Sequence, residues 1–110
     1  NPKTIRATMG SIFRVPFVYV PELSPVLTQM HEKGIHTYAA HLKGKEYYDS
    51  FSFREPTAFL IGNEGNGLTK EISDQSGQYL KIPMEGKVES LNASIAAALL
   101  MYEAHRQRKL

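Results

Sequence analysis

Short apolar runs alternate along the chain with segments of helical periodicity, which is the pattern of an α/β domain with a mostly parallel sheet. The clearest strand is the continuous apolar run 57–61, because a strand covered on both faces is apolar at every position. The predicted strands are 15–20, 36–42, 57–61 and 79–83. Residues 43–55 are polar and aromatic and predict no regular element. No repeat or linker divides the chain, so we predict a single domain.

Two helices are predicted between these strands. Ser24 is the expected N-cap of the first, with Pro25 at its first helical position and Gly34 as the left-handed residue that ends it. This helix therefore extends to about Lys33. A short helix over 68–76 follows a glycine-rich segment.

A third helix is predicted to begin after Asn92 and to extend to about Arg108. Its expected core-facing stripe consists of Ile95, Leu99 and Tyr102, with Ala96 beside them. Further alanines make the helix apolar nearly all round, which indicates burial on more than one side. We therefore expect it to lie between the sheet and a partner chain.

Two loops of unusual composition follow predicted strands. Gly62-Asn63-Glu64-Gly65-Asn66-Gly67 leads from a strand into a helix, and residues 82–92 join the next strand to the last helix. The carboxyl ends of parallel strands share one edge of the sheet, where ligands bind in α/β folds. The glycine spacing matches neither the dinucleotide motif nor the P-loop. It does allow the backbone to turn sharply and to lie against a flat ligand.

Each loop also has a purely structural explanation. The glycines alone fit a tight connection with a solvated Glu64, and Ser90 and Asn92 are good helix caps. The convergence of both loops at one edge of the sheet favours a ligand site over these explanations.

Composition and charge exclude several classes of function. The 110 residues include 13 Lys and Arg against 11 Asp and Glu, and the net charge of +2 permits an anionic partner such as RNA without requiring one. The absence of cysteine excludes disulfides, thiolate metal sites and a cysteine nucleophile. The histidines form no metal-binding motif, so we expect no metal. The longest uncharged run, 90–102, is too short to span a membrane, and no signal-peptide pattern is found, so we expect a cytoplasmic protein.

The two loops carry motifs of a known family. Residues 59–68 resemble the second motif of the SpoU (TrmH-type) RNA 2′-O-ribose methyltransferases, and residues 82–97 resemble their third motif. Residues 1–11 are similar to the stretch that leads into the family's central strands. The resemblance covers essentially the whole chain, and it is specific because both motifs occur in the family's order, each at a strand end.

This resemblance implies a fold, a cofactor, a partner and a set of site residues. The implied fold is an α/β, SPOUT-type, mostly parallel sheet flanked by helices, with a C-terminal trefoil knot. The implied methyl donor is S-adenosylmethionine, and the implied assembly is a homodimer. The implied cofactor-binding residues are Ala39, Ala40, Gly62, Ile82 and Leu91. The implied catalytic-site residues are Glu64, which orients a basic group or braces its loop, and Ser90 and Asn92, which position the ribose or an arginine.

The sequence departs from the family in one respect. The first family motif, an Asn-x-Gly followed by an arginine, is not found in these residues, and neither is the N-terminal RNA-binding domain common in the family. We therefore expect residues 1–110 to be the C-terminal portion of a SpoU catalytic domain. The expected function is ribose methylation of ribosomal RNA. The alternatives are a transfer RNA methyltransferase, a non-catalytic RNA-binding or dimerisation module, and a nucleotide-binding regulatory domain.

Overall fold

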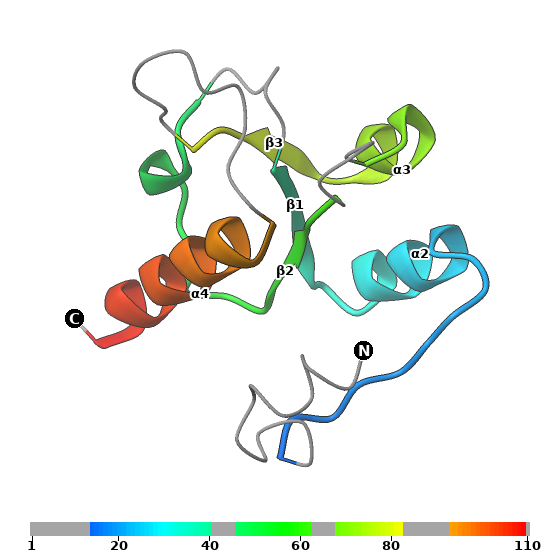
Figure 1. Cartoon of the computed structure of the whole chain (residues 1–110), viewed down its shortest axis with the longest axis horizontal. Coiled ribbons are helices and arrows are strands. Elements are labelled where there is room, and N and C mark those ends of the chain that lie inside the picture. The colour runs from blue at the N-terminus through cyan, green and yellow to red at the C-terminus, as the bar shows by residue number, and fades with distance from the viewer. Residues whose placement is uncertain (1–13, 41–45, 63–67, 83–92, 110) are drawn as a thin grey trace.

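Three parallel strands form the sheet of the computed structural model, which describes residues 14–40, 46–62, 68–82 and 93–109 (Figure 1). In the order in which they lie in the sheet, the strands are β2 (Thr57–Leu60), β1 (His36–Ala40) and β3 (Gln78–Leu80). Leu60 is opposite Ala39, and Leu80 is opposite Ala40. The carboxyl ends of all three strands therefore lie at one edge of the sheet.

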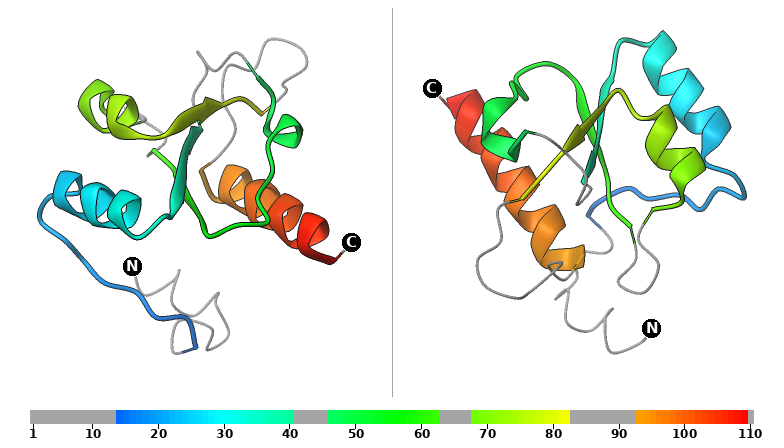
Figure 2. Two further views of the ribbon diagram at one scale, coloured as in Figure 1. Left: turned by 180° about the vertical axis from the view of Figure 1, so that it is seen from behind. Right: turned by 90° about the horizontal axis from the view of Figure 1, so that it is seen from above.

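Helices cover both faces of the sheet (Figures 1 and 2). They are α2 (Ser24–Glu32), α3 (Lys70–Gln75) and α4 (Ala93–Lys109). Side chains alternate between the two faces along a strand, so Ala39 packs with Leu27 of α2 whereas Tyr38 packs with Leu100 of α4. α2 and α3 therefore lie on one face and α4 lies on the other, which confirms the α/β fold class predicted from the sequence.

A cluster of aromatic rings fills the space between the sheet and α4. Phe53 is completely buried, and its ring centroid lies 5.0 Å from the centroids of Tyr38 and Phe59, in edge-to-face contact with both. Phe51 lies against the rings of Tyr38 and Phe53. Both phenylalanines follow the 3-10 turn η2 (Tyr48–Ser50), in a segment for which the sequence predicts no regular element. The packing of these two phenylalanines against the core fixes the position of that segment.

The predicted strand over residues 15–20 is wrong. These residues pair with no described strand, and the side chains of Phe17, Val18 and Tyr19 are 64%, 81% and 90% exposed. An apolar run makes a strand only where a neighbouring strand takes up its backbone hydrogen bonds and another layer covers its side chains. Among the described residues, this segment has neither.

The start of α2 differs from the prediction, and its end does not. The helix begins at Ser24 itself, its N-cap is Leu23, and no side chain caps it. The Ser24 hydroxyl instead accepts a 3.0 Å hydrogen bond from Gln75 Nε2, which ties α2 to α3. Gly34 follows the helix with a φ of 78°, so the predicted left-handed stop is confirmed.

The core-facing stripe predicted for α4 is wrong at three of its four positions. Ile95, Leu99 and Tyr102 are exposed, whereas Ala96 is buried as predicted. The other buried residues of α4 are Leu100, Glu103, Ala104 and Gln107. Because α4 is apolar over much of its circumference, periodicity alone does not select a face. The buried face includes two polar side chains, Glu103 and Gln107, and Gln107 also pairs with backbone groups of Phe51 and Phe53, which are far away in the sequence.

Parts of the predicted architecture fall outside the described residues. Residues 63–67 and 83–92 are among them, so the predicted C-terminal knot and the predicted cap at Asn92 stay predictions. The described helices include none that is long and apolar enough to cross a membrane.

Candidate functional site

The predicted cofactor site lies at the carboxyl edge of the sheet. Ala40 is the last residue of β1, and Gly62 and Ile82 lie two residues beyond the ends of β2 and β3. Neighbouring strands are about 4.8 Å apart, and β1 lies between the other two. The fold therefore brings three of the residues proposed from the sequence to adjacent strand ends.

The predicted residues differ in how accessible their side chains are. Ala40, Gly62 and Ile82 are half-buried. Ala39 is fully buried in the core against Leu27 and Leu60, so only its backbone is available for a role at the cofactor. The remaining predicted site residues, which lie outside the described residues, are Glu64, Ser90, Leu91 and Asn92.

A short backbone pairing extends the sheet beyond β3 at the same edge. Tyr47 and Lys81 form a parallel β-bridge. The Tyr48 N–H donates to the Lys81 carbonyl, and the Lys81 N–H donates to the Glu46 carbonyl, each at 2.9 Å. Lys81 Nζ lies 5.7 Å from the centroid of the Tyr47 ring. Sequence reasoning missed this pair, and the available indication was a lysine within a predicted strand together with an aromatic-rich segment.

A network of charged and amide groups anchors the C-terminal half of α4. Arg106 donates to both carboxylate oxygens of Glu103, at 2.7 and 2.9 Å, and Gln107 Nε2 donates to one of them at 3.0 Å. These hydrogen bonds and the charge of Arg106 lower the pKa of Glu103 to about 2. Arg108 donates from Nε to the carbonyl of Phe53 and from Nη2 to that of Glu55, at 2.9 and 3.0 Å.

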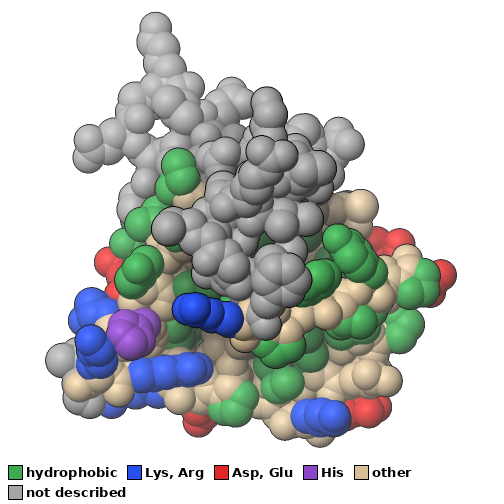
Figure 3. Space-filling model, turned by 60° about the horizontal axis from the view of Figure 1, so that its bottom comes forward, with side chains coloured by type: hydrophobic (Ala, Val, Ile, Leu, Met, Phe, Trp, Pro, Cys, Tyr) green, Lys and Arg blue, Asp and Glu red, His purple; other side chains and the backbone are tan. Residues whose placement is uncertain are grey.

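Lys and Arg side chains gather on the side of the molecule where α4 ends (Figure 3, lower left). The basic residues in the last turn of α4 are Arg106, Arg108 and Lys109. Two of them are held by Glu103 and by backbone carbonyls, as described above, and cations near a helix C-terminus also complement its dipole. This basic surface therefore has a structural explanation.

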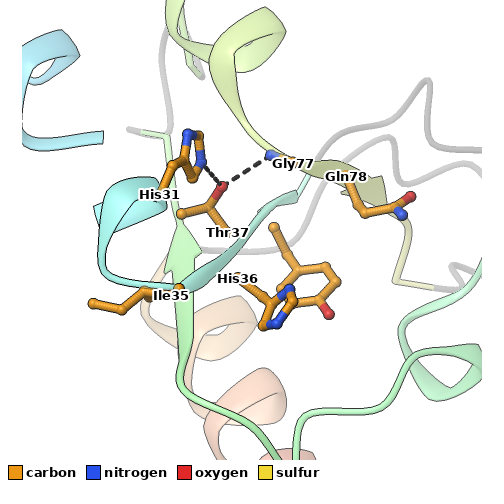
Figure 4. A pocket seen from close by; sticks show the side chains of 8 residues that line it. His31, Ile35, His36, Thr37, Gly77 and Gln78 are labelled. Carbon is orange, nitrogen blue, oxygen red and sulfur yellow. Dashed lines mark hydrogen bonds between the residues drawn. The ribbon is translucent and has the colours of Figure 1, made fainter. Parts of the chain in front are cut away.

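A pocket of about 300 Å³ lies at the opposite, amino edge of the sheet (Figure 4). Thr37 Oγ1 accepts a 2.9 Å hydrogen bond from the Gly77 N–H and lies 2.7 Å from His31 Nε2. These contacts close the turn before β3 against β1. The two candidate ligand loops follow the other ends of the strands, so this pocket is not the predicted site. Within the described part of the chain, no group of three or more His, Cys, Asp or Glu could hold a metal ion.

A parallel sheet covered on both faces, with its candidate ligand loops at the carboxyl edge, defines an α/β ligand-binding domain. The chain belongs to the SpoU rRNA Methylase family, whose model matches residues 1–102. This match confirms the resemblance carried by the two loop motifs.

Individual relatives are similar over nearly the whole chain. A Bacillus subtilis (strain 168) protein, YacO, named as a TrmH family tRNA/rRNA methyltransferase, is 38% identical over 103 residues, which cover 94% of this chain and 41% of the relative. The structure of the SpoU methyltransferase AviRb from Streptomyces viridochromogenes in complex with AdoMet is 35% identical with a TM-score of 0.89, covering 98% of this chain and 45% of that one. A structure titled RNA 2′-O ribose methyltransferase is 34% identical with a TM-score of 0.88. The match covers 99% of this chain and 42% of that one. The chain thus spans less than half the length of each of these proteins.

Proposed function

We propose that the chain is the C-terminal portion of a cytoplasmic, S-adenosylmethionine-dependent RNA 2′-O-ribose methyltransferase. The observation that carries this proposal is the adjacency of Ala40, Gly62 and Ile82 at the carboxyl edge of the sheet, where both family motifs fall. The AdoMet bound to AviRb supports the cofactor, and the similar RNA 2′-O ribose methyltransferase supports the site of methylation.

The described residues fit such a cofactor. Gly62 has no side chain and Ala40 has only a methyl group, so a flat ring can approach the backbone of β2 and β1 closely. Ile82 adds an apolar surface at the end of β3. All three are partly accessible to solvent.

The chemistry assigns roles to the polar residues of the two loops. A ribose 2′-hydroxyl is a poor nucleophile, so it must be held in line with the methyl group while its developing negative charge is stabilised. When bound, S-adenosylmethionine supplies a methyl group on a positively charged sulfur, which is an activated leaving group. We assign the positioning of the ribose, or of an arginine from outside this chain, to Ser90 and Asn92. We assign Glu64 either to orienting a basic group or to bracing its loop.

We also infer that two copies of the protein pair through α4. Ile95, Leu99 and Tyr102 are spaced so that they share one side of the helix, and they are 53%, 39% and 74% exposed. The half-buried Ala98 beside them is small enough to allow close helix approach. The sheet of the same chain does not cover this apolar stripe. A second copy of the protein packed against the stripe would bury it. Obligate interfaces of this kind bury about 2,000 Å² or more in total.

Ribosomal RNA is the proposed substrate, and transfer RNA is the second candidate because YacO is named for both. The test incubates the full-length protein with methyl-labelled S-adenosylmethionine and with unmodified ribosomal or transfer RNA, followed by mass spectrometry of the nucleosides. A labelled 2′-O-methyl ribose is the expected product, and Asn92→Ala should reduce its rate. A label on a base contradicts the proposed position. RNA binding without any transfer indicates the non-catalytic module.

A further inference from the structure

Tyr47 and Lys81 lie level with the proposed cofactor-binding edge. The strand register places Lys81 and Gly62 at the same level, one residue beyond the end of β1 and on opposite sides of it. With strands about 4.8 Å apart, the two backbones are separated by about 10 Å, and Tyr47 lies one strand spacing further out. The Tyr47–Lys81 pair is therefore close to the proposed site of methyl transfer without forming part of the predicted cofactor set.

Backbone hydrogen bonds hold Tyr47 at this edge, and its side chain is open to solvent. Two hydrogen bonds of 2.9 Å hold the residues on either side of Tyr47 against Lys81. The side chain of Tyr48 packs against the aromatic core, whereas Tyr47 is 46% exposed. An aromatic ring on a hydrogen-bonded backbone is a preformed flat surface, because it has little conformational freedom left to lose on binding.

Lys81 places a positive charge over one face of that ring. Its Nζ lies 5.7 Å from the ring centroid of Tyr47. Among the ion pairs between described residues, none includes Lys81. Bases of single-stranded RNA stack on aromatic side chains, and cationic side chains bind the phosphates. A flat ring next to an ammonium group therefore matches the two parts of one nucleotide.

We propose that Tyr47 and Lys81 bind a nucleotide of the RNA that flanks the methylated one, with its base on the Tyr47 ring and its phosphate on Lys81 Nζ. This inference rests on the proposed function and adds residues that bind RNA to those that bind the cofactor. The carboxylate of a bound cofactor offers the same anionic chemistry to Lys81, so cofactor affinity is measured alongside RNA affinity.

The test measures binding of the full-length protein to two fluorescent probes, a short single-stranded oligoadenylate and a ribose-phosphate chain of equal length without bases. Tyr47→Leu removes the ring, so it should weaken oligoadenylate binding by about fivefold or more and leave the base-free probe unaffected. Lys81→Met removes the charge, so it should weaken binding of both probes. It should also reduce the slope of log affinity against log salt concentration by about 0.7. Tyr47→Phe and Lys81→Arg should bind both probes like the wild type.

Matched controls come from exposed residues elsewhere in the chain. Tyr19→Leu, in the segment that leads into α2, and Lys70→Met, on α3, should leave both affinities unchanged, and the unfolding midpoints establish that all variants are folded. If Tyr47→Leu and Lys81→Met bind both probes with the affinity of the wild-type protein, the inference is overturned. Loss of S-adenosylmethionine affinity in Lys81→Met with RNA affinity retained also overturns it. In a further outcome, the wild type and the variants bind the probes as expected while no methyl group is transferred to RNA. That result contradicts the proposed function and supports the RNA-binding role of Tyr47 and Lys81.

Discussion

Gln107 and Phe53 are 54 residues apart in the sequence, and the side-chain Oε1 of Gln107 accepts a 2.6 Å hydrogen bond from the Phe53 N–H. Gln107 Nε2 also donates to the carbonyl of Phe51 at 2.9 Å. The amide of a helical side chain thus pairs with an irregular segment as the backbone of a neighbouring strand would. Because Phe53 is completely buried, this pairing satisfies groups that water cannot reach.

Gln107→Leu should destabilise the protein by about 2–4 kcal/mol, since it leaves a buried N–H and a carbonyl without partners. Gln107→Glu should be similarly harmful, because it keeps the acceptor, loses the donor and places a second carboxylate beside Glu103. Urea unfolding measures both variants, with the exposed Gln29→Leu of α2 as a control that should change stability by less than about 0.5 kcal/mol. Wild-type stability of Gln107→Leu would show that the pairing contributes nothing net.

Glu103 should make the protein sensitive to acid. Its pKa falls from the usual 4.5 to about 2 in the folded protein, because Arg106 and Gln107 donate hydrogen bonds to the carboxylate. A lowered pKa stabilises the folded state above about pH 4.5, and this contribution is lost as the pH falls toward 2. Its size is about 1–2 kcal/mol, less than the full shift implies, because the Arg106 side chain is 61% exposed.

Unfolding measured between pH 7 and pH 2 checks this expectation. Glu103→Gln should lower stability at pH 7 and flatten the acid dependence between pH 4.5 and 2. Glu71→Gln is the control, because Glu71 is exposed in the first turn of α3. If the stability of Glu103→Gln depends on acid pH as that of the wild type does, other carboxylates are responsible for the acid dependence.

Gly62→Val should weaken S-adenosylmethionine binding by about tenfold or more, because a branched side chain would occupy the space where the backbone must approach the ligand. Calorimetry on the full-length protein measures the affinity. Thr57→Val also introduces a valine, at the opposite end of β2, and should leave the affinity unchanged. A folded Gly62→Val protein with wild-type affinity would remove Gly62 from the cofactor site.

Two residues on different sides of α4 should respond differently to truncation. Leu100 is completely buried and Tyr102 is 74% exposed, so Leu100→Ala should cost about 2–5 kcal/mol of stability, whereas Tyr102→Ser should mainly weaken self-association. Sedimentation of the full-length protein at low micromolar concentration, alongside unfolding, separates the two effects. A wild-type monomer at that concentration contradicts the proposed dimer.

The sequence predicted those features that depend on local pattern. Three strands were identifiable because each is a short apolar run with a clear stop, and Gly34 marked a helix end because few other residues adopt its conformation. The placement of Ala40 and Gly62 at one edge followed from parallel strands. These inferences need no knowledge of distant contacts.

Features that depend on distant partners could not be predicted. The buried face of α4 includes Gln107, whose backbone partners lie more than fifty residues earlier in the chain. The apolar pattern of residues 15–20 says nothing about whether a neighbouring strand is present. Tyr47 and Lys81 become neighbours only through an isolated β-bridge of one residue on each side. A pairing this short produces no periodic pattern in the sequence.

The hydrogen bond to Gln107 makes the amide of Phe53 a reporter of how firmly α4 is held. This amide can exchange its hydrogen with deuterated water only when α4 separates from the segment before β2, so its exchange rate measures the free energy of that local opening. α4 directly follows the loop that carries Ser90 and Asn92. A ligand that stabilises that loop and the helix after it should therefore slow exchange at Phe53, at the far end of α4 from where the ligand binds.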